Sequence, residues 1–484
     1  MPAVVVEDVT ADSRTVRPGA CFIAISGTAT DGHRFIPQAV ASGAVAVVYE
    51  NPSFGSQIPE GVAAIQVANA RRAAAILADR FWDRPSRALT VVPVTGTNGK
   101  TSTVHLLESI LLAAGHRTGM IGTLGRRVDG ATVPASRTTP DAIELQSLLA
   151  RMRDEGVTHV AMELSSHAID LDRAWGCSFA GAVFTNLTPE HLDWHGDLPT
   201  YQASKTRLFT DYADLAGPEH EMVGAINVDD PAGPEIAGVA RCRVITYALA
   251  AASMVRAQGV TSAATGSHFD LVTPDYSAPI SLKLVGRFNV YNALAAGACA
   301  YGLGISRDAI VAGLEALSSV PGRLQRVDRG QPFGVLVDYA HSGDALENVL
   351  RTARELGPRR LICVFGCGGD RDRTKRPVMG AIATEMADLA IVTSDNPRSE
   401  DPLAIIADIT SGAVAGRYEI EPDRASAIGM AIGQAQEGDL VVICGKGHED
   451  YQEFANGRRV HFDDREAAAE ALAARGYGGK AGGS

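Results

Sequence analysis

Cysteine is scarce in this sequence, and the few cysteines form no metal or redox pattern. Seven cysteines are spread over 484 residues. The closest pair, Cys363 and Cys367, lacks the C-x-x-C spacing of zinc and thiol redox motifs. An odd, sparse set of cysteines is typical of a reducing compartment. The cysteine content therefore favours a cytoplasmic protein over a disulfide-stabilised secreted one.

Long hydrophobic runs and a leader segment are also missing. The longest apolar run, residues 293–305, is shorter than the roughly 18 residues that a membrane span needs. The first residues do not show the basic segment followed by an apolar segment that marks a secretory signal. We therefore expect a cytoplasmic protein without a membrane partner.

Positive charge is in short supply. Lys and Arg number 44 against 56 Asp and Glu, so the formal net charge is −12. Such a chain has no general attraction for nucleic acid or anionic lipid. We expect no nucleic-acid partner, and a polyanionic ligand must be bound by local Lys, Arg and backbone N–H groups.

The length and the 46% hydrophobic content are enough for about three domains. In the first block, short β-like segments are predicted at 21–25, 45–49 and 63–67, with a helix at 71–82. In the second, strands at 89–94, 157–162, 180–185 and 222–228 alternate with helices, which is typical of a parallel sheet covered on both faces. In the third, strands are predicted at 335–337, 361–365, 389–393 and 440–444. The expected domains are 1–87, 88–320 and 321–484.

The segment TGTNGKT at 95–101 is the sharpest motif. It follows a predicted strand and opens a predicted helix with Val104, Leu107 and Leu111 on one face. There, backbone N–H groups can bind phosphates, Lys100 can neutralise phosphate charge and Thr101 can ligate Mg²⁺. The general phosphate-loop pattern has Gly where Val94 stands. The alternative is a tight turn with a solvated lysine.

Other polar segments follow predicted strands in the second block. Glu163 can help to hold the Mg²⁺ of a nucleotide, although a helix-capping acid is equally consistent with its position. His191 and His195 have a spacing seen in zinc sites, but Leu192 stands where a zinc protease has Glu. By itself, Lys205 is an ordinary exposed lysine on an amphipathic helix.

Four polar clusters follow four strands of the third block, at 338–341, 366–373, 395–398 and 445–449. Since the carboxyl ends of parallel strands share one edge of a sheet, these clusters predict the rim of one site. Arginines combined with an acid suit a zwitterion. The cluster at 366–373 is not a dinucleotide fingerprint, because Arg371 replaces the last Gly.

Together these segments resemble the Mur ligase family of bacterial cell-wall synthesis. The resemblance rests on TGTNGKT at 95–101, MELSSH at 162–167, NLTPEHLDWHG at 186–196, GRFNVYN at 286–292, PGRLQ at 321–325 and DYAHSGDALENVL at 338–350. The family's shortened GTNGKT loop accounts for Val94. DNPR at 395–398 resembles the signature of the members that use meso-diaminopimelate.

The resemblance implies an α/β fold of three domains. These are a small N-terminal UDP-binding domain, a central P-loop-type ATPase domain with a parallel sheet, and a C-terminal Rossmann-like domain. The implied reaction is ATP-driven amide formation between meso-2,6-diaminopimelate and UDP-N-acetylmuramoyl-L-alanyl-D-glutamate, through an acyl phosphate. The implied cofactors are ATP and Mg²⁺, with Lys205 carbamylated so that its oxygens can bind a cation. We expect a monomer.

The resemblance also implies a role for each matching position. Lys100, Lys205 and His191 are implied to be catalytic, and Thr101, Glu163, His191 and Lys205 to hold Mg²⁺. The nucleotide is expected at Thr95, Gly96, Thr97, Asn98, Gly99, Lys100, Thr101, Asn289, Asn292, Arg323 and Asp338. The UDP-dipeptide is expected at Ser13, Thr28, Ala29, Thr30, Thr138, Thr139, Ser165 and Arg173. Diaminopimelate is expected at Arg371, Asp395, Asn396, Pro397, Arg398, Gly445 and Glu449.

Two kinds of alternative remain. A sister ligase that adds L-lysine or ornithine, or a folylpolyglutamate synthetase, shares the scaffold, but the DNPR and GCGGDRD segments argue against both. A nucleotide-binding regulatory switch would use the phosphate loop without needing the strand-end clusters of the third block.

Overall fold

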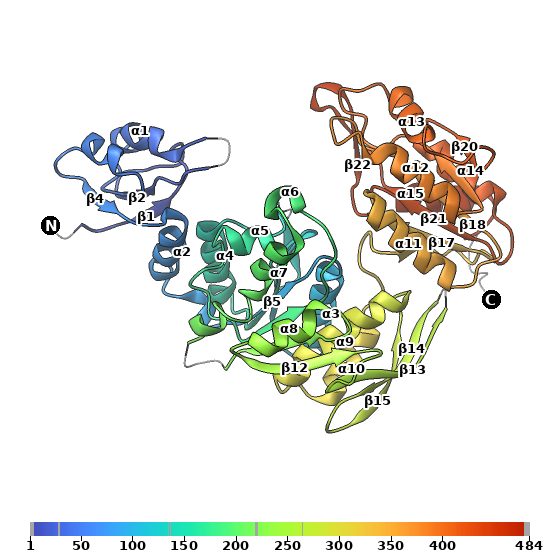
Figure 1. Ribbon diagram of the computed structural model, residues 1–484, viewed down its shortest axis with the longest axis horizontal. Coiled ribbons are helices and arrows are strands. Elements are labelled where there is room, and N and C mark those ends of the chain that lie inside the picture. Colours follow the sequence, from blue (N-terminus) through green and yellow to red (C-terminus); the bar gives the residue numbers. More distant parts are fainter. Residues whose placement is uncertain are drawn as a thin grey trace, which may run out of the picture. The chain divides into compact units, whose positions relative to one another are not determined.

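The computed structural model describes residues 4–27, 30–133, 135, 137–217, 221–263 and 265–478. The chain divides into two compact units. The first contains residues 1–258, 271–278 and 291–316, and the second contains residues 259–270, 279–290 and 317–484. Both units alternate strands with helices, so the fold is of the α/β class (Figure 1).

The start of the chain folds into a small parallel sheet with helices on both faces. Its strands are β1 (Asp8–Thr10), β2 (Ala20–Ile23), β3 (Ala46–Tyr49) and β4 (Ala63–Gln66), paired in that order. Side chains of a strand alternate between its two faces. Cys21 of β2 therefore packs in one core with helix α2 (Ala70–Phe81), whereas Phe22 packs in the other with α1 (Ile36–Ala41). The strands and the helix predicted at 21–25, 45–49, 63–67 and 71–82 are present.

An eleven-stranded sheet follows, in the order β15-β14-β13-β12-β11-β10-β5-β9-β6-β7-β8. Its parallel centre consists of β5 (Thr90–Thr95), β6 (Thr118–Gly122), β9 (His159–Glu163), β10 (Gly181–Phe184), β11 (Val223–Asn227) and β12 (Arg243–Ala248). The outer strands are β7 (Gly125–Val128), β8 (Ala131–Val133), β13 (Val255–Ala263), β14 (Gly266–Val272) and β15 (Ser277–Leu282). The four strands predicted for this block form β5, β9, β10 and β11.

The sequence pattern predicts a parallel sheet, but one edge of the sheet is antiparallel. β6 pairs with β7, and β7 with β8, in antiparallel fashion. The turn between β7 and β8 is Asp129-Gly130, with φ of 47° and 88°. An Asp-Gly pair with positive φ at both positions suits a tight hairpin, because its twist matches that of the flanking strands. This short signal explains the antiparallel edge.

Helix α3 (Lys100–Ala113) follows β5 and is buried around most of its surface. Apart from the predicted face of Val104, Leu107 and Leu111, residues such as Leu106 and Ile110 are also buried. The reason is that α3 contacts β5, β6 and β9 and also the helix α10 (Arg307–Ala316). The remaining helices of this region are α4 (Ala142–Asp154), α5 (Ser166–Asp170), α6 (Leu192–His195), α7 (Leu198–Thr206), α8 (Ala232–Val239) and α9 (Arg287–Gly302).

The C-terminal sheet has the order β16-β17-β21-β18-β19-β20. Its strands are β16 (Gln325–Arg326), β17 (Gly334–Asp338), β18 (Leu361–Phe365), β19 (Leu389–Val392), β20 (Tyr418–Ile420) and β21 (Leu440–Cys444). All neighbours except β16 and β17 are parallel. A separate hairpin consists of β22 (Tyr451–Glu453) and β23 (Arg459–His461). The four predicted strands of this block are present.

Helices cover both faces of the C-terminal sheet. Phe365 packs in one core with α11 (Gly343–Glu355), α12 (Lys375–Met386) and α13 (Pro402–Thr410). Its neighbour Val364 packs in the opposite core with α14 (Arg424–Gln434) and α15 (Asp464–Ala474). Because both faces of the sheet are buried, the side chains on both faces are apolar, and each strand is a continuous apolar run in the sequence.

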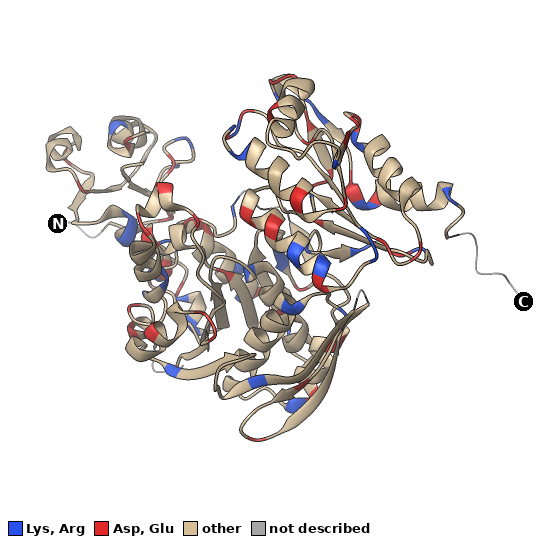
Figure 2. Cartoon of the chain, turned by 45° about the vertical axis from the view of Figure 1, so that its right-hand side comes forward, with Lys and Arg blue, Asp and Glu red and all other residues tan. Residues whose placement is uncertain are grey.

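Acidic and basic residues are interspersed along the helices rather than separated by sign, as Figure 2 shows. Among the described residues, no helix is both long enough and apolar enough to cross a membrane.

Candidate functional site

The loop 95–101 joins β5 to α3 and is shaped by two glycines with positive φ. Gly96 has φ of +145°, and a Cβ there would lie 1.8 Å from the Thr185 hydroxyl oxygen. Gly99 has φ of +86°, and a Cβ there would lie 2.3 Å from Asn292 Oδ1. Both positions therefore require glycine. Asn292, predicted to border the nucleotide, lies against this loop.

Hydrogen bonds to the segment after β10 hold the loop in place. The backbone N–H of Thr97 donates to the Asn186 carbonyl at 2.8 Å, and that of Asn98 donates to Asn186 Oδ1 at 2.8 Å. Lys100 Nζ donates to the carbonyls of Gly96 and Thr97 at 2.9 and 2.7 Å. The ammonium thus folds back over the loop, next to the helix N-terminus, where phosphate binding is favoured.

Glu163, at the end of β9, meets the end of this loop. Its Oε1 accepts a hydrogen bond from the Thr101 hydroxyl at 3.0 Å. Thr123 holds the same carboxylate through its backbone N–H, at 2.8 Å to Oε1, and through its hydroxyl, at 3.1 Å to Oε2. Glu163 is 2% exposed. A hydroxyl and a carboxylate so placed are oxygen ligands of the kind that Mg²⁺ prefers.

The predicted UDP-dipeptide residues of the central sheet surround the end of β9. The Thr138 hydroxyl lies 3.1 Å from that of Thr123. The Thr139 hydroxyl donates to the Glu163 carbonyl at 2.9 Å and accepts from the Ser165 N–H at 3.2 Å. Arg173 Nη1 donates to the Thr139 carbonyl at 3.0 Å. The four residues therefore lie along one connected path.

Lys205 is buried, in contrast to the exposed position that its helix pattern alone suggests. It is 1% exposed, and its Nζ lies 4.3 Å from the centre of the Tyr201 ring. Burial, together with the nearby Lys100 ammonium, holds the pKa of Lys205 well below its usual value. The Tyr201 hydroxyl lies 3.3 Å from that of Thr97, so Tyr201 links Lys205 to the loop 95–101, called the phosphate loop below.

His191 lies near the same tyrosine. Its ring centre is 6.3 Å from that of Tyr201 and 4.8 Å from that of His167. His191 has φ of 57° and is the N-cap residue of α6. The neighbouring His195 is buried and lies 3.0 Å from the Ser166 hydroxyl through Nε2. The structure therefore brings His191 and Lys205 around one aromatic ring.

The predicted uridine-end residues are described only in part. Ser13 is 9% exposed, and its hydroxyl donates to Gln38 Oε1 at 3.3 Å. Thr30 is exposed, and its carbonyl accepts from the Gly27 N–H at 3.0 Å. Thr28 and Ala29 lie outside the described residues.

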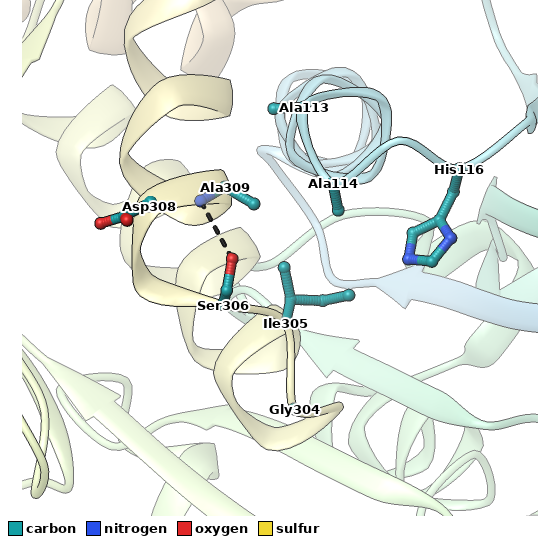
Figure 3. A pocket seen from close by; sticks show the side chains of 8 residues that line it. All are labelled: Ala113, Ala114, His116, Gly304, Ile305, Ser306, Asp308 and Ala309. Carbon is teal, nitrogen blue, oxygen red and sulfur yellow. Dashed lines mark hydrogen bonds between the residues drawn. The ribbon is translucent and has the colours of Figure 1, made fainter.

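A hollow of about 480 Å³ lies at the opposite end of α3 (Figure 3). It is lined by Ala113, Ala114, His116, Gly304, Ile305, Ser306, Asp308 and Ala309. Since α3 has 14 residues and is therefore roughly 20 Å long, this hollow is remote from the phosphate loop. None of the predicted site residues lines it.

In the second unit, Arg323 and Asp338 lie near the start of the C-terminal sheet, and Asn289 lies in α9. Asp338, at the end of β17, accepts backbone hydrogen bonds from Leu324 and Ala340, both at 2.8 Å. Burial raises the pKa of Asp338, and Arg323 opposes this shift. The Arg323 guanidinium lies 5.5 Å from the Tyr339 ring centre. Asn289 is 1% exposed and donates to the Val285 carbonyl at 2.8 Å.

The four polar clusters follow β17, β21, β18 and β19, which are consecutive neighbours in the sheet. The clusters after β18 and β19 touch through their backbones. The Gly369 N–H donates to the Asn396 carbonyl at 2.9 Å, and a Cβ on Gly369 would lie 1.9 Å from the Pro397 carbonyl. Gly445, after β21, has φ of +123°, and a Cβ there would lie 3.5 Å from Asp395 Oδ2. The clusters after β18, β19 and β21 therefore lie together at one edge of the sheet.

Arg398 is held by two neighbours. Its Nε pairs with Glu453 Oε2 at 3.1 Å, and its Nη1 donates to the Gly369 carbonyl at 2.8 Å. Its backbone has φ of 50°, and its N–H donates to the Glu453 carbonyl at 3.0 Å. Arg371 is exposed, next to Gly368. The β22 strand thus takes part in this rim.

Asn396 and Glu449 meet at the centre of the rim. Asn396 Nδ2 donates to Glu449 Oε2 at 3.0 Å. Lys446 is fully buried and lies within hydrogen-bonding distance of Asp395, Asn396 and Glu449. The rim therefore combines carboxylates, an amide and cations, as a zwitterion requires.

The chain is similar to known proteins along most of its length. Three family models match the chain in order, namely the Mur ligase family catalytic domain over residues 5–82, the middle domain over 94–300 and the glutamate ligase domain over 322–447. A Bacillus cereus protein named UDP-N-acetylmuramoyl-L-alanyl-D-glutamate–2,6-diaminopimelate ligase is 44% identical over 471 residues, which cover 97% of this chain and 94% of that protein. The chain belongs to the Mur ligase family. A protein of the same name from Syntrophomonas wolfei is 47% identical over 466 residues, which cover 95% of this chain and 93% of that protein.

The three-domain Mur ligase fold is also found in solved structures. A structure titled as a UDP-N-acetylmuramoyl-L-alanyl-D-glutamate–2,6-diaminopimelate ligase superposes with a TM-score of 0.73 at 34% identity. The alignment covers 98% of this chain and 96% of that chain. The fold expected from the family resemblance is therefore confirmed.

The structure adds residues to this Mur ligase's site that sequence reasoning missed. Thr123 follows β6, a strand that was not predicted, so nothing marked it. Tyr201 lies one helical turn before Lys205, and this i, i+4 spacing was the available signal. Glu453 lies in β22, which the pattern did not show. Lys446 lies in the polar cluster 445–449, but its burial depends on residues from other elements.

Proposed function

We propose that this Mur ligase adds meso-2,6-diaminopimelate to UDP-N-acetylmuramoyl-L-alanyl-D-glutamate with hydrolysis of ATP to ADP and phosphate. The reaction class rests on one observation, the phosphate loop backed by the hydrogen bond from Thr101 to Glu163 at 3.0 Å. The choice of substrates is supported by the names of relatives that are 43–47% identical to the chain. Those names favour this function over a lysine- or ornithine-adding ligase or a folylpolyglutamate synthetase.

The chemistry proceeds in two balanced steps. An oxygen of the D-glutamate side carboxylate attacks the γ-phosphorus of ATP, and the bond from that phosphorus to the bridging oxygen breaks, which releases ADP. The neutral amine of diaminopimelate then attacks the acyl phosphate carbon, phosphate leaves, and the nitrogen loses a proton. Lys100 donates hydrogen bonds next to the developing phosphoryl charge, where fixed donors are most effective.

Mg²⁺ and a carbamylated lysine are part of the proposal. When bound, Mg²⁺ screens the repulsion between the triphosphate and the carboxylate. Thr101 and Glu163 would hold one ion, and His191 and Lys205 a second. Burial and the depressed pKa favour the neutral Lys205 amine, which is the form that adds CO₂. The resulting carbamate oxygens could ligate a cation, whereas the ammonium could not.

The remaining site residues are assigned from the family resemblance of their sequence motifs. We place the UDP-dipeptide at Ser13, Thr28–Thr30, Thr138, Thr139, Ser165 and Arg173. We place diaminopimelate at Arg371, Asp395–Arg398, Gly445 and Glu449, and the rest of the nucleotide at Asn289, Asn292, Arg323 and Asp338. We retain 1–87, 88–320 and 321–484 as the domains, and propose a cytoplasmic monomer, since ATP and UDP-linked precursors are supplied in the cytoplasm.

A phosphate-release assay tests the proposed function. The purified protein is incubated with Mg²⁺-ATP, and the UDP-dipeptide and meso-diaminopimelate are omitted in turn. We expect phosphate release only when all three substrates are present, together with a UDP-tripeptide product seen by mass spectrometry. Phosphate release that ignores the amino acid contradicts the ligase function. Equal use of L-lysine contradicts the substrate choice alone.

A further inference from the structure

Lys446 is a buried lysine at the centre of the loops that we assign to the amino acid. Its side chain is 0% exposed, so its ammonium depends on protein partners in place of water. Nζ lies 3.4 Å from Asp395 Oδ1, 3.0 Å from Asn396 Oδ1 and 3.4 Å from Glu449 Oε2. These acceptors come from the loops after β19 and β21. One cation therefore ties both loops together.

The same contact determines which way the Asn396 amide points. Asn396 Oδ1 faces two donors, Lys446 Nζ and the backbone N–H of Glu453 at 2.9 Å. Neither donor can accept a hydrogen bond, so the amide oxygen must face them. Nδ2 is then directed at Glu449 Oε2, at 3.0 Å. Lys446 thus orients Asn396, which in turn holds the Glu449 carboxylate.

Lys446 also sets the charge of this part of the rim. Asp395 and Glu449 bring two negative charges, and Lys446 offsets one of them. Near neutral pH, meso-diaminopimelate has two ammonium and two carboxylate groups, whereas L-lysine lacks one of those carboxylates. Diaminopimelate therefore has no net charge, whereas L-lysine is a cation. An uncompensated negative charge in the rim favours L-lysine relative to diaminopimelate, and specificity follows the difference between the two.

We propose that Lys446 is a positioning and specificity residue that orients Asn396 and Glu449 and selects an amino acid with a second carboxylate. This inference rests on the proposed function.

The test compares two amino acids on the same enzyme preparation. Lys446→Met keeps the side-chain length and removes the charge, and Lys446→Gln retains one donor toward Asn396. Lys283→Met, at an exposed lysine of the same unit, is the matched control. We expect the ratio of kcat/KM for meso-diaminopimelate to that for L-lysine to fall about ten- to hundredfold in Lys446→Met. The reason is that Asp395 and Glu449 lose a positive charge within hydrogen-bonding distance, and this leaves one negative charge of the rim uncompensated. Lys446→Gln should show a smaller fall, and the KM for ATP should not change.

The ratio does not depend on the fraction of folded protein, because both amino acids are measured on one preparation. An unchanged ratio in Lys446→Met overturns the inference, and so does an equal rise of KM for ATP and diaminopimelate. If Lys446→Met does not fold, the ratio in Lys446→Gln decides. If the wild-type protein shows no phosphate release with meso-diaminopimelate, the proposed function fails, and the inference about Lys446 fails with it. If the wild type is active and the ratio stays constant, only the role of Lys446 fails.

Discussion

At the scale of single residues, lysine is scarce, with six in the chain. Two of them carry the proposed chemistry, and a third carries the proposed specificity. Lys100 folds over the phosphate loop, Lys205 is enclosed beside Tyr201, and Lys446 joins two loops of the C-terminal sheet. A compact ammonium responds strongly to burial and to neighbouring charge, which guanidinium does not. Because the three lysines have different surroundings, we expect their substitutions to have different effects.

Lys100→Ala is expected to lower kcat by roughly 10²–10³, because a fixed positive charge next to the transferred phosphoryl group is lost. Steady-state phosphate release at saturating Mg²⁺-ATP measures this effect, with Lys283→Ala as the control. Activity close to that of the wild type would remove the phosphate loop from the mechanism.

Lys205→Ala is expected to lose most activity, because a carbamate ligand can no longer form. Short carboxylates added to the assay should restore part of the lost activity, and they should not affect Lys283→Ala. Carbon-13 NMR with labelled bicarbonate should show a carbamate in the wild type and none in Lys205→Ala. A fully active Lys205→Ala variant is incompatible with the metal-ligand role.

Arg398→Ala is expected to raise the KM for meso-diaminopimelate far more than the KM for ATP. An arginine that meets a substrate carboxylate is worth roughly 2–5 kcal/mol when its partner is truncated. Arg458→Ala is the matched control, since Arg458 is exposed and stacks on Phe454 at 4.9 Å. If both KM values rise together, Arg398 only braces the loop through Glu453 and Gly369.

At the scale of elements, the rim depends on contacts that join the loops after β18 and β19 to the helices behind them. Arg376 of α12 is fully buried and pairs with Glu400 at 2.7 Å and with Asp408 of α13 at 2.9 Å. Its Nη2 lies 3.3 Å from the Gly368 carbonyl. One guanidinium therefore links two helices to both loops, as its planar fork allows.

Glu400→Gln is expected to change how stability depends on pH. The hydrogen bonds from Arg376 lower the pKa of Glu400 to about 2. A carboxylate with a lowered pKa stabilises the fold fully above its unfolded pKa, and the contribution is lost as the pH falls through the folded value. The wild type should therefore be more stable than Glu400→Gln at neutral pH, and this difference should shrink between about pH 4.5 and 2.

Urea unfolding at a series of pH values measures the Glu400 effect, with the exposed Glu437→Gln as the control. A difference that stays constant down to about pH 2 would mean that the ion pair with Arg376 contributes nothing to stability.

At the scale of the whole molecule, the chain forms two compact units, each with its own sheet edge lined by polar loops. The phosphate loop belongs to the first unit, and the rim around Asn396 to the second. Each unit has its own buried core, so a substitution in the second unit away from the proposed nucleotide residues, such as Glu400→Gln, should leave the loop 95–101 of the first unit intact.

Mg²⁺-ADP is expected to raise the unfolding temperature of the protein, because it binds the loop 95–101 of the first unit together with the nucleotide residues proposed in the second. Binding to the native state alone stabilises by about 2.7 kcal/mol at a ligand concentration one hundred times Kd. Lys100→Ala should lose this shift, and Glu400→Gln, in the second unit, should keep it. Calorimetry with and without Mg²⁺-ADP tests both statements. A shift that survives in Lys100→Ala would place the nucleotide elsewhere.

The sequence by itself determined the parts of this protein that depend on short-range pattern. The α/β class, the central strands and the phosphate loop could be predicted, because alternating strands and helices and a glycine-bearing turn are local features. The rim could also be predicted, since parallel strands place their carboxyl ends at one edge. The Asp129-Gly130 hairpin was overlooked although its signal is local.

Only the tertiary structure decided what depends on burial and on distant partners. Lys205 and Lys446 look like surface lysines in sequence, yet both are enclosed, because the residues that surround them come from other elements. Thr123 meets Glu163 across 40 positions, and Asn396 meets Glu449 across 53. Such pairs leave no periodic trace in the chain, since the separation between them is set by the order of strands in the sheet and not by any local repeat.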